Sequence, residues 1–152
     1  MTTGLLLRLG ALVAVGLATW LIVLAVRAYA AARKRQTLAA APADLPAELG
    51  AATDGAGVRV LAFSSEDCSP CHTLQRPALA RLLDERQGQV SVTEIDAPSS
   101  PELTQRYAVL TVPTTVVLDA TGKAHAVNYG FANAAKLLAQ VDGALGAQAV
   151  SA

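Results

Sequence analysis

The first part of the chain is a long apolar segment. Leu5 to Val26 contains no charged residue apart from Arg8. As a helix it would measure roughly 33 Å, enough to cross a hydrocarbon core of about 30 Å. The pattern predicts one transmembrane helix over residues 5–27, which makes the lipid bilayer a partner of the chain. A cleaved signal peptide is the alternative, helped by the small residues of Ala28-Tyr29-Ala30, but the apolar run is longer than a typical signal core.

Basic residues flank this segment unequally. Four of them, Arg27, Arg33, Lys34 and Arg35, follow it, whereas only Arg8 and the amino terminus precede its uncharged part. Basic residues stay on the cytoplasmic side of a membrane. The bias therefore predicts a single-pass protein of the cell membrane whose C-terminal part faces the cytoplasm.

The rest of the chain divides into a linker and a domain. Residues 28–57 combine a basic stem with an Ala-, Pro- and Gly-rich stretch and are predicted to be a tether. Residues 58–147 then alternate between strand and helix patterns. The predicted strands are 58–63, 90–95, 115–118 and 125–129, and the predicted helices are 70–87, 99–107 and 133–145. This order predicts an α/β fold with a central mixed sheet and helices on both faces.

Apolar spacing and helix-start residues give two more detailed expectations. The apolar positions expected to form the periodic face of helix 70–87 are Leu74, Leu79, Leu82 and Leu83,. The segment Ser99-Ser100-Pro101-Glu102 offers a Ser cap, Pro in the first turn, and Glu placed to complete a capping box.

The net charge of zero hides an uneven distribution. All twelve acidic residues lie at or after Asp44, while five of the twelve basic residues precede it. The C-terminal domain is therefore acidic. This argues against nucleic-acid binding, which needs a basic face.

The only two cysteines of the chain form the motif Cys68-Ser69-Pro70-Cys71. It falls between the strand pattern of 58–63 and the following helix, which places the first sulfur at a helix N-terminus. There the unpaired N–H groups and the helix dipole stabilise a thiolate, the reactive form of cysteine. The second cysteine lies one turn further on, close enough to form a disulfide with the first. The position predicts redox chemistry rather than a structural disulfide.

Together with this motif, several other segments resemble the thioredoxin family in order and spacing. They are Val60–Phe63, Ile95-Asp96, the run Tyr107–Thr114, the strand Thr115–Leu118, the turn Asp119–Lys123, and Gly130. The resemblance covers roughly Val58 to Leu145 and implies a thioredoxin-like fold. It also implies that Pro113 is a cis-proline packed against the sulfurs, where the alternative is an ordinary strand-entry proline. Val112, Thr114 and Gly130 would line a substrate groove.

By this resemblance the chain is expected to be a thiol-disulfide oxidoreductase that uses no cofactor. Cys68 would be the exposed nucleophile that attacks a substrate disulfide, and Cys71 the shielded cysteine that resolves the mixed disulfide. Ser69-Pro70 is similar to the Gly-Pro pair of reducing thioredoxins, which favours a protein-disulfide reductase. The implied partners are a disulfide-containing protein substrate and an upstream electron donor. Many membrane-tethered members of the family face outward, unlike the orientation that the basic residues predict.

The chain departs from the family pattern beside the first cysteine. Asp67, with Glu66 next to it, stands where the family has a tryptophan. Its negative charge should raise the pKa of the Cys68 thiol. Protonated His72 could offset that charge, or His72 could be a solvent-facing helix residue. Asp67, Ser69, Pro70 and His72 are therefore the candidate tuning residues.

Two further departures concern the proton of Cys71. The buried aspartate that assists the resolving cysteine in thioredoxins falls on Ala62, and the lysine that pairs with it falls on Val92. The loss of both is coherent, because neither charge is left buried alone. It also removes the usual proton acceptor for Cys71.

The same residues allow three other functions. Cys68 to His72 matches C-x-x-C-H, the attachment motif of c-type haem, although the later Val-Pro-Thr and the lack of any methionine beyond Met1 argue against it. A zinc site needs about four ligands, and Cys68, Cys71, His72 and His125 offer poor geometry, so no metal site is predicted. A thioredoxin-like thiol chaperone or adaptor would bind partners at the Pro113 groove without turnover.

Overall fold

The computed structural model describes residues 2–39 and 57–151, and the chain separates into two units, Met1–Arg35 and Gln36–Ala152. The N-terminal unit is formed by all but the last four residues of the helix α1 (Thr2–Ala39). This helix continues past the predicted membrane boundary at residue 27 and includes the basic residues of the stem. Most of the predicted tether, residues 40–56, lies outside the described residues.

The apolar part of α1 is long enough to cross a membrane. Leu12–Tyr29 meets the requirements of length and composition, and none of its side chains is buried. The hydroxyl of Thr19 donates to the carbonyl oxygen of Val15 at 2.9 Å, so this polar group is satisfied within the helix. A signal sequence would meet the same requirements.

The C-terminal unit is built on a mixed sheet of four strands, as the sequence predicted. The strands are β1 (Val58–Ser64), β2 (Val90–Asp96), β3 (Thr114–Leu118) and β4 (Ala124–Tyr129), in the order β2-β1-β3-β4. β1 pairs parallel with β2 and antiparallel with β3, and β3 pairs antiparallel with β4. Each strand begins and ends within one residue of its predicted bounds.

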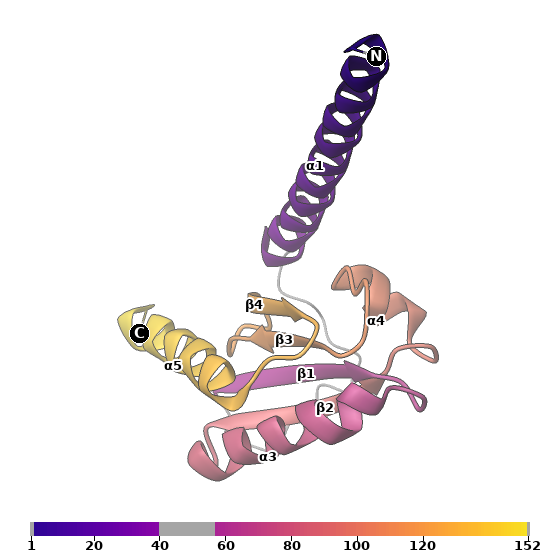
Figure 1. The fold of residues 1–152 in the computed structure, drawn as a ribbon. Helices are drawn as coiled ribbons and strands as arrows, with labels where there is room; N and C mark the ends of the chain where they lie inside the picture. The colour runs from indigo at the N-terminus through magenta and orange to yellow at the C-terminus, as the bar shows by residue number, and fades with distance from the viewer. Residues whose placement is uncertain (1, 40–56, 152) are drawn as a thin grey trace. The chain divides into compact units, whose positions relative to one another are not determined.

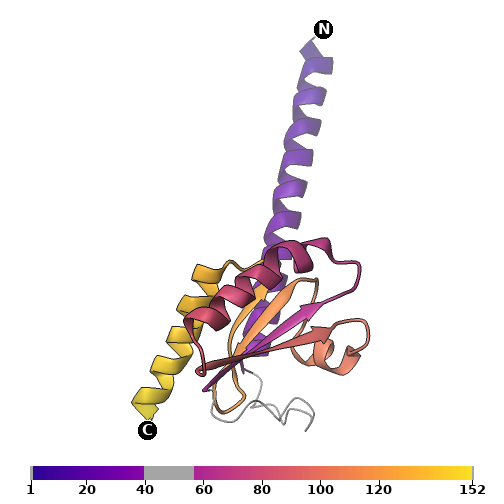
Figure 2. The same cartoon turned by 90° about the horizontal axis from the view of Figure 1, so that it is seen from below.

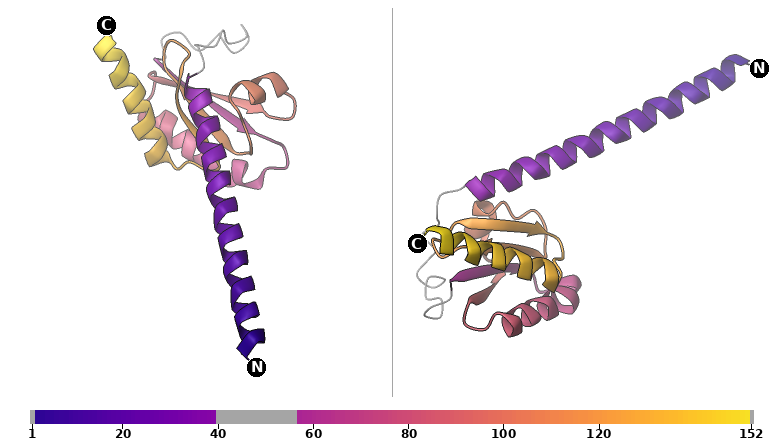
Figure 3. Two further views of the ribbon diagram at one scale, coloured as in Figure 1. Left: turned by 90° about the horizontal axis from the view of Figure 1, so that it is seen from above. Right: turned by 90° about the vertical axis from the view of Figure 1, so that its left-hand side faces the viewer.

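Helices cover both faces of this sheet (Figures 1 and 2). They are the π-helical turn η1 (Cys71–Gln75), α3 (Arg76–Glu85), α4 (Pro101–Arg106) and α5 (Ala134–Ser151). On one face α3 and α5 contact each other, and α5 lies against β1, β3 and β4 (Figure 3). α4 lies on the other face. The predicted thioredoxin-like fold is confirmed.

Alternation along the strands creates one apolar core on each face. On β1, Val60 and Ala62 point toward α3 and α5, whereas Leu61 and Phe63 point toward the α4 side. The Phe63 ring there contacts Tyr107, with ring centroids 6.1 Å apart. Both faces of β1 are therefore buried against apolar side chains, which explains why its sequence is a continuous apolar run. The carboxyl end of β1 leads directly into the cysteine motif.

The buried face of the helix after the motif differs from its prediction. Leu74 and Leu83 are 49% and 38% exposed, whereas Gln75 and Ala78 are buried beside Leu79 and Leu82. The helix opens with a π turn instead of a regular α turn. A π turn holds one more residue than an α turn, so the side chains of this segment are rotated relative to the α-helical spacing. The prediction for Leu74 was wrong for that reason. Leu83 lies in the regular helix α3 and is exposed next to the buried Leu82, so the π turn does not account for it.

The predicted capping box is also wrong. α4 begins at Pro101, but Ser100 makes no side-chain hydrogen bond at the cap. Ser99 instead donates from both its hydroxyl and its N–H to Oδ2 of Asp96, at the end of β2. The loop is therefore fastened to the strand rather than to the helix.

Candidate active site

The two cysteines are joined by a disulfide at the point where β1 gives way to helix. Their Cα atoms are 5.3 Å apart. Helical backbone begins at Ser69, so Cys68 is the residue that precedes the first turn. The N–H of Cys71 lies 3.3 Å from Sγ of Cys68 and also bonds the Cys68 carbonyl oxygen at 3.0 Å. A helix N–H thus points at the first sulfur, where it can stabilise a thiolate.

The two sulfurs are less different in exposure than the resemblance implied. Cys68 is 7% exposed and Cys71 is 4% exposed. Asp67, Ser69 and Pro70 are exposed around Cys68. Their tuning roles, and the separate roles of the two cysteines, stay predictions.

Pro113 lies beside the cysteines. Its bond to Val112 is cis, its side chain is buried, and it shares a small cavity with Cys71. Its carbonyl oxygen accepts the N–H of Gly130 at 2.9 Å, and Gly130 has φ +81°, a conformation that favours glycine,. The residues predicted to line a groove are therefore brought together by backbone contacts.

The side chains of that predicted groove differ from one another. Val112 is half-buried and packs on the core of the α4 face. Thr114 is fully buried, and its hydroxyl donates to the carbonyl oxygen of Thr111 at 2.6 Å. Thr114 can therefore offer a substrate only its backbone. The groove role of Val112, Thr114 and Gly130 stays a prediction.

His72 is exposed, but it also has a specific contact. Its Nε2 lies 3.1 Å from the carbonyl oxygen of Glu66, in the loop before the cysteines. A carbonyl oxygen only accepts hydrogen bonds, so Nε2 carries the proton in this contact. His72 therefore ties the first helical turn to the loop, which the sequence did not predict.

Gln75 is a site residue that the sequence analysis missed. Its side chain is 3% exposed, and its amide bonds both backbone groups of Ala132. Nε2 donates to the Ala132 carbonyl oxygen at 3.1 Å, and Oε1 accepts the Ala132 N–H at 2.9 Å. This pair fastens the turn that carries Cys71 to the segment after Gly130. No sequence signal singles out Gln75, because Thr73 and Arg76 near it are polar as well.

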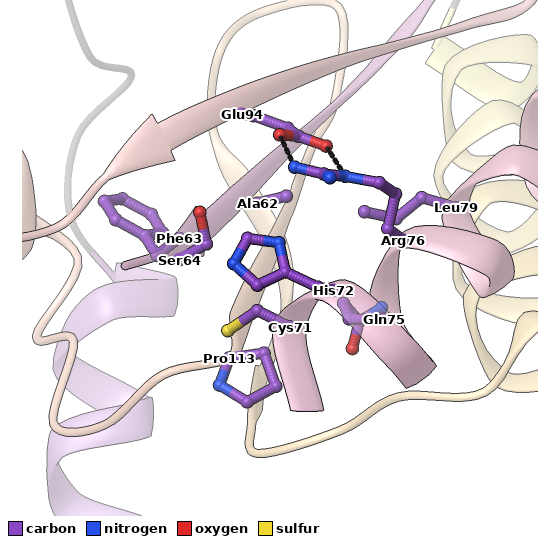
Figure 4. Close-up of a pocket in the computed structure, with 10 residues that line it drawn as sticks. All are labelled: Ala62, Phe63, Ser64, Cys71, His72, Gln75, Arg76, Leu79, Glu94 and Pro113. Carbon is purple, nitrogen blue, oxygen red and sulfur yellow. Dashed lines mark hydrogen bonds and ion pairs between the residues drawn. The ribbon is translucent and has the colours of Figure 1, made fainter. Parts of the chain in front are cut away.

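A charged pair with half-exposed side chains lines the same cavity (Figure 4). The guanidinium of Arg76 donates two hydrogen bonds to the carboxylate of Glu94, at 3.2 and 3.0 Å. These bonds, and then the negative charge, raise the pKa of Arg76. Glu94 stands directly opposite Ala62 in the β1–β2 register. The cavity has a volume of about 10 Å³, which is about the space of one water molecule.

The geometry gives the metal and haem alternatives no support. Among the described residues, no group of three or more His, Cys, Asp or Glu side chains is placed to hold a metal ion. Both sulfurs that haem attachment would need are already joined to each other.

Comparison with known proteins agrees with this geometry. A family model described as Thioredoxin matches residues 51–143, more than half of the chain. A comparison of the sequence with curated proteins finds no match.

Similar solved structures include three thioredoxins. A mutant thioredoxin from Halobacterium salinarum is 24% identical, with a TM-score of 0.57, covering 69% of this chain and 94% of that one. Chloroplastic thioredoxin z is 24% identical (TM-score 0.55; 66% and 88% covered). Thioredoxin-2 of the malaria parasite, described as part of its protein secretion machinery, is 21% identical (TM-score 0.52; 57% and 82% covered). At these identities the likeness concerns the fold alone.

Proposed function

The chain belongs to the thioredoxin family of thiol-disulfide oxidoreductases, and we propose that it is a membrane-tethered reductase of protein disulfides. The observation that carries the proposal is the disulfide between Cys68 and Cys71 with a helix N–H directed at the first sulfur. A pair that can close and open at this position can pass two electrons to a substrate disulfide.

The reaction proceeds in two exchanges. The thiolate of Cys68 attacks one sulfur of the substrate disulfide and forms a mixed disulfide, releasing the other substrate sulfur. Cys71 then attacks Cys68, releases the reduced substrate and leaves the Cys68–Cys71 disulfide. An upstream dithiol donor must reduce this disulfide before the next turn. The Ser69-Pro70 pair supports the reducing direction.

We propose that substrates bind in an extended conformation along Val112, the backbone of Thr114, and Gly130. Pro113 and Gly130 are already joined by a backbone hydrogen bond, so this surface is organised before a substrate arrives. Phe131 is 47% exposed next to it and offers an apolar contact for the residues that flank a substrate cysteine.

Insulin reduction tests the catalytic part of the proposal. The full-length protein in detergent micelles, supplied with dithiothreitol, should precipitate the insulin B chain well above the rate of dithiothreitol alone. The Cys68→Ser variant should fall to that background rate, since it has no nucleophile at the helix terminus. Wild-type protein that binds reduced insulin but gives only the background rate would instead support the thiol chaperone or adaptor.

We further propose that α1 is retained as a single-pass anchor through Leu5–Val26, that residues 28–57 form its tether, and that residues 58–147 are the redox domain. The unburied apolar surface of Leu12–Tyr29 supports the anchor. The four basic residues after the span support a cytoplasmic domain.

Protease treatment tests this orientation. In inside-out vesicles the domain should be digested, whereas in intact cells it should be protected, because the basic stem stays in the cytoplasm. Replacing Arg33, Lys34 and Arg35 together by serine should weaken the preference, and this variant serves as the control. Digestion in intact cells would contradict the orientation. A shortened protein that lacks its first residues and is recovered outside the membrane fraction would contradict the anchor.

A further inference from the structure

Cys71 must lose a proton that its surroundings make hard to remove. Its thiol has to become a thiolate before it can attack the mixed disulfide, yet the residue is only 4% exposed. The neighbouring strand residue on this side is Ala62, whose methyl group cannot accept a proton. An acceptor must therefore come from another part of the cavity wall.

Besides Cys71, the ionisable residues among those lining this cavity are His72, Arg76 and Glu94. They come from three different elements: η1, α3 and β2. Arg76 does not give up its proton in proteins, so it cannot act as a base. His72 donates from Nε2 to the Glu66 carbonyl oxygen, which leaves its Nδ1 unprotonated, so His72 is the rival acceptor that experiment must separate from a carboxylate. Glu94 is the one carboxylate in this wall.

We propose that Glu94 is the proton acceptor for Cys71, acting through one water molecule in the cavity; this rests on the proposed redox function. The parallel register places Glu94 directly opposite Ala62, on the same face of the sheet. The carboxylate is thus on β2, next to the β1 position where thioredoxins have their aspartate, and Glu94 lines the same cavity as Cys71 (Figure 4).

Arg76 sets the orientation of this carboxylate. It donates one hydrogen bond to each oxygen of Glu94, at 3.2 and 3.0 Å. An ionised carboxylate has about four acceptor positions, so two remain for a water. The guanidinium also compensates the negative charge that would otherwise disfavour a thiolate nearby. Arg76 is therefore a positioning residue in this proposal.

The step balances without any further reagent. The proton of Cys71 passes to the water while a water proton passes to Glu94. The Cys71 sulfur bonds Cys68, and the bond from Cys68 to the substrate sulfur breaks, so its electron pair leaves on the substrate thiolate. Glu94 then returns its proton to that thiolate or to solvent. In the opposite direction, protonated Glu94 supplies the proton to Cys71 when the disulfide opens.

The two exchanges can be timed separately with dithiobis(nitrobenzoate) and the reduced full-length protein in micelles. Attack by Cys68 releases one coloured thiolate, and resolution by Cys71 releases the second. Glu94→Gln should leave the first phase unchanged and slow the second about a hundredfold or more near neutral pH, as general-base effects are typically at least of that size. Its second phase should recover as the pH rises, because hydroxide then removes the proton.

Electrostatics alone predict the opposite sign. Removing the negative charge of Glu94 while Arg76 stays would favour the Cys71 thiolate, so a faster or unchanged second phase overturns the proposal. A slowing confined to His72→Gln would also overturn it and assign the proton to the imidazole. If wild-type protein gives no first phase, the proposed redox function fails, and this inference with it.

Asp142→Asn is the matched control. Asp142 accepts two hydrogen bonds from Arg86, at 2.8 and 2.9 Å, and does not line the cavity. This variant therefore removes one carboxylate charge from a similar arginine pair elsewhere on the domain. Both of its phases should match those of the wild type, and a slowed second phase would assign the effect to net charge and overturn the proposal.

Discussion

Replacing Cys71 by serine should leave the full-length protein covalently joined to its substrates. Cys68 keeps its place before the first helical turn, where the N–H of residue 71 points at its sulfur, so it can still attack. Serine cannot complete the second exchange because its hydroxyl is not ionised near neutral pH. Complexes that vanish on reduction should accumulate on non-reducing gels, and mass spectrometry should place the bond at Cys68.

Cys68→Ser is the matched control for this trap. It retains one cysteine in the same motif, but Cys71 is one turn inside the helix, away from the N–H groups of the helix terminus that stabilise a thiolate at Cys68. It should form few mixed disulfides and lose essentially all turnover. Equal trapping by the two variants would contradict the assignment of Cys68 as nucleophile and Cys71 as resolving residue.

Replacing Gln75 by methionine should weaken both the domain and its substrate binding. The N–H and carbonyl of Ala132 would lose their buried partner, and each unsatisfied group costs about 1–3 kcal/mol. We therefore expect the free energy of unfolding to fall by about 2–4 kcal/mol. Without these hydrogen bonds the segment after Gly130 is no longer held beside the proposed substrate surface, so KM for insulin should rise more than kcat falls.

Gln140→Met separates these two effects. Gln140 exchanges two hydrogen bonds with Asn128, at 2.8 and 2.9 Å, between α5 and β4. Gln140→Met should lower the free energy of unfolding, measured in denaturant by tyrosine fluorescence. It should leave KM for insulin unchanged. If both variants changed KM equally, Gln75 would have only a general structural role.

The sequence by itself determined the fold and the location of the site. Alternation and apolar runs placed each strand within one residue, since a strand buried on both faces leaves a continuous apolar signal. The spacing from Cys68 and Cys71 to Pro113 indicated the family, because those residues are close in sequence to recognisable strand ends. The long apolar run before residue 27 indicated a membrane-length helix in the same way.

Only the tertiary structure decided which side chains line the cavity beside Cys71. The π turn at Cys71–Gln75 directs Leu74 outward and Gln75 inward. The periodicity of the sequence cannot reveal this, because it assumes regular α-helical turns. The approach of Glu94 to the cavity depends on the pairing of β1 with β2. That pairing joins residues more than thirty positions apart, and pattern analysis of single segments carries no information about it. Local spacing thus fixes which elements form, whereas register and packing decide which side chains meet.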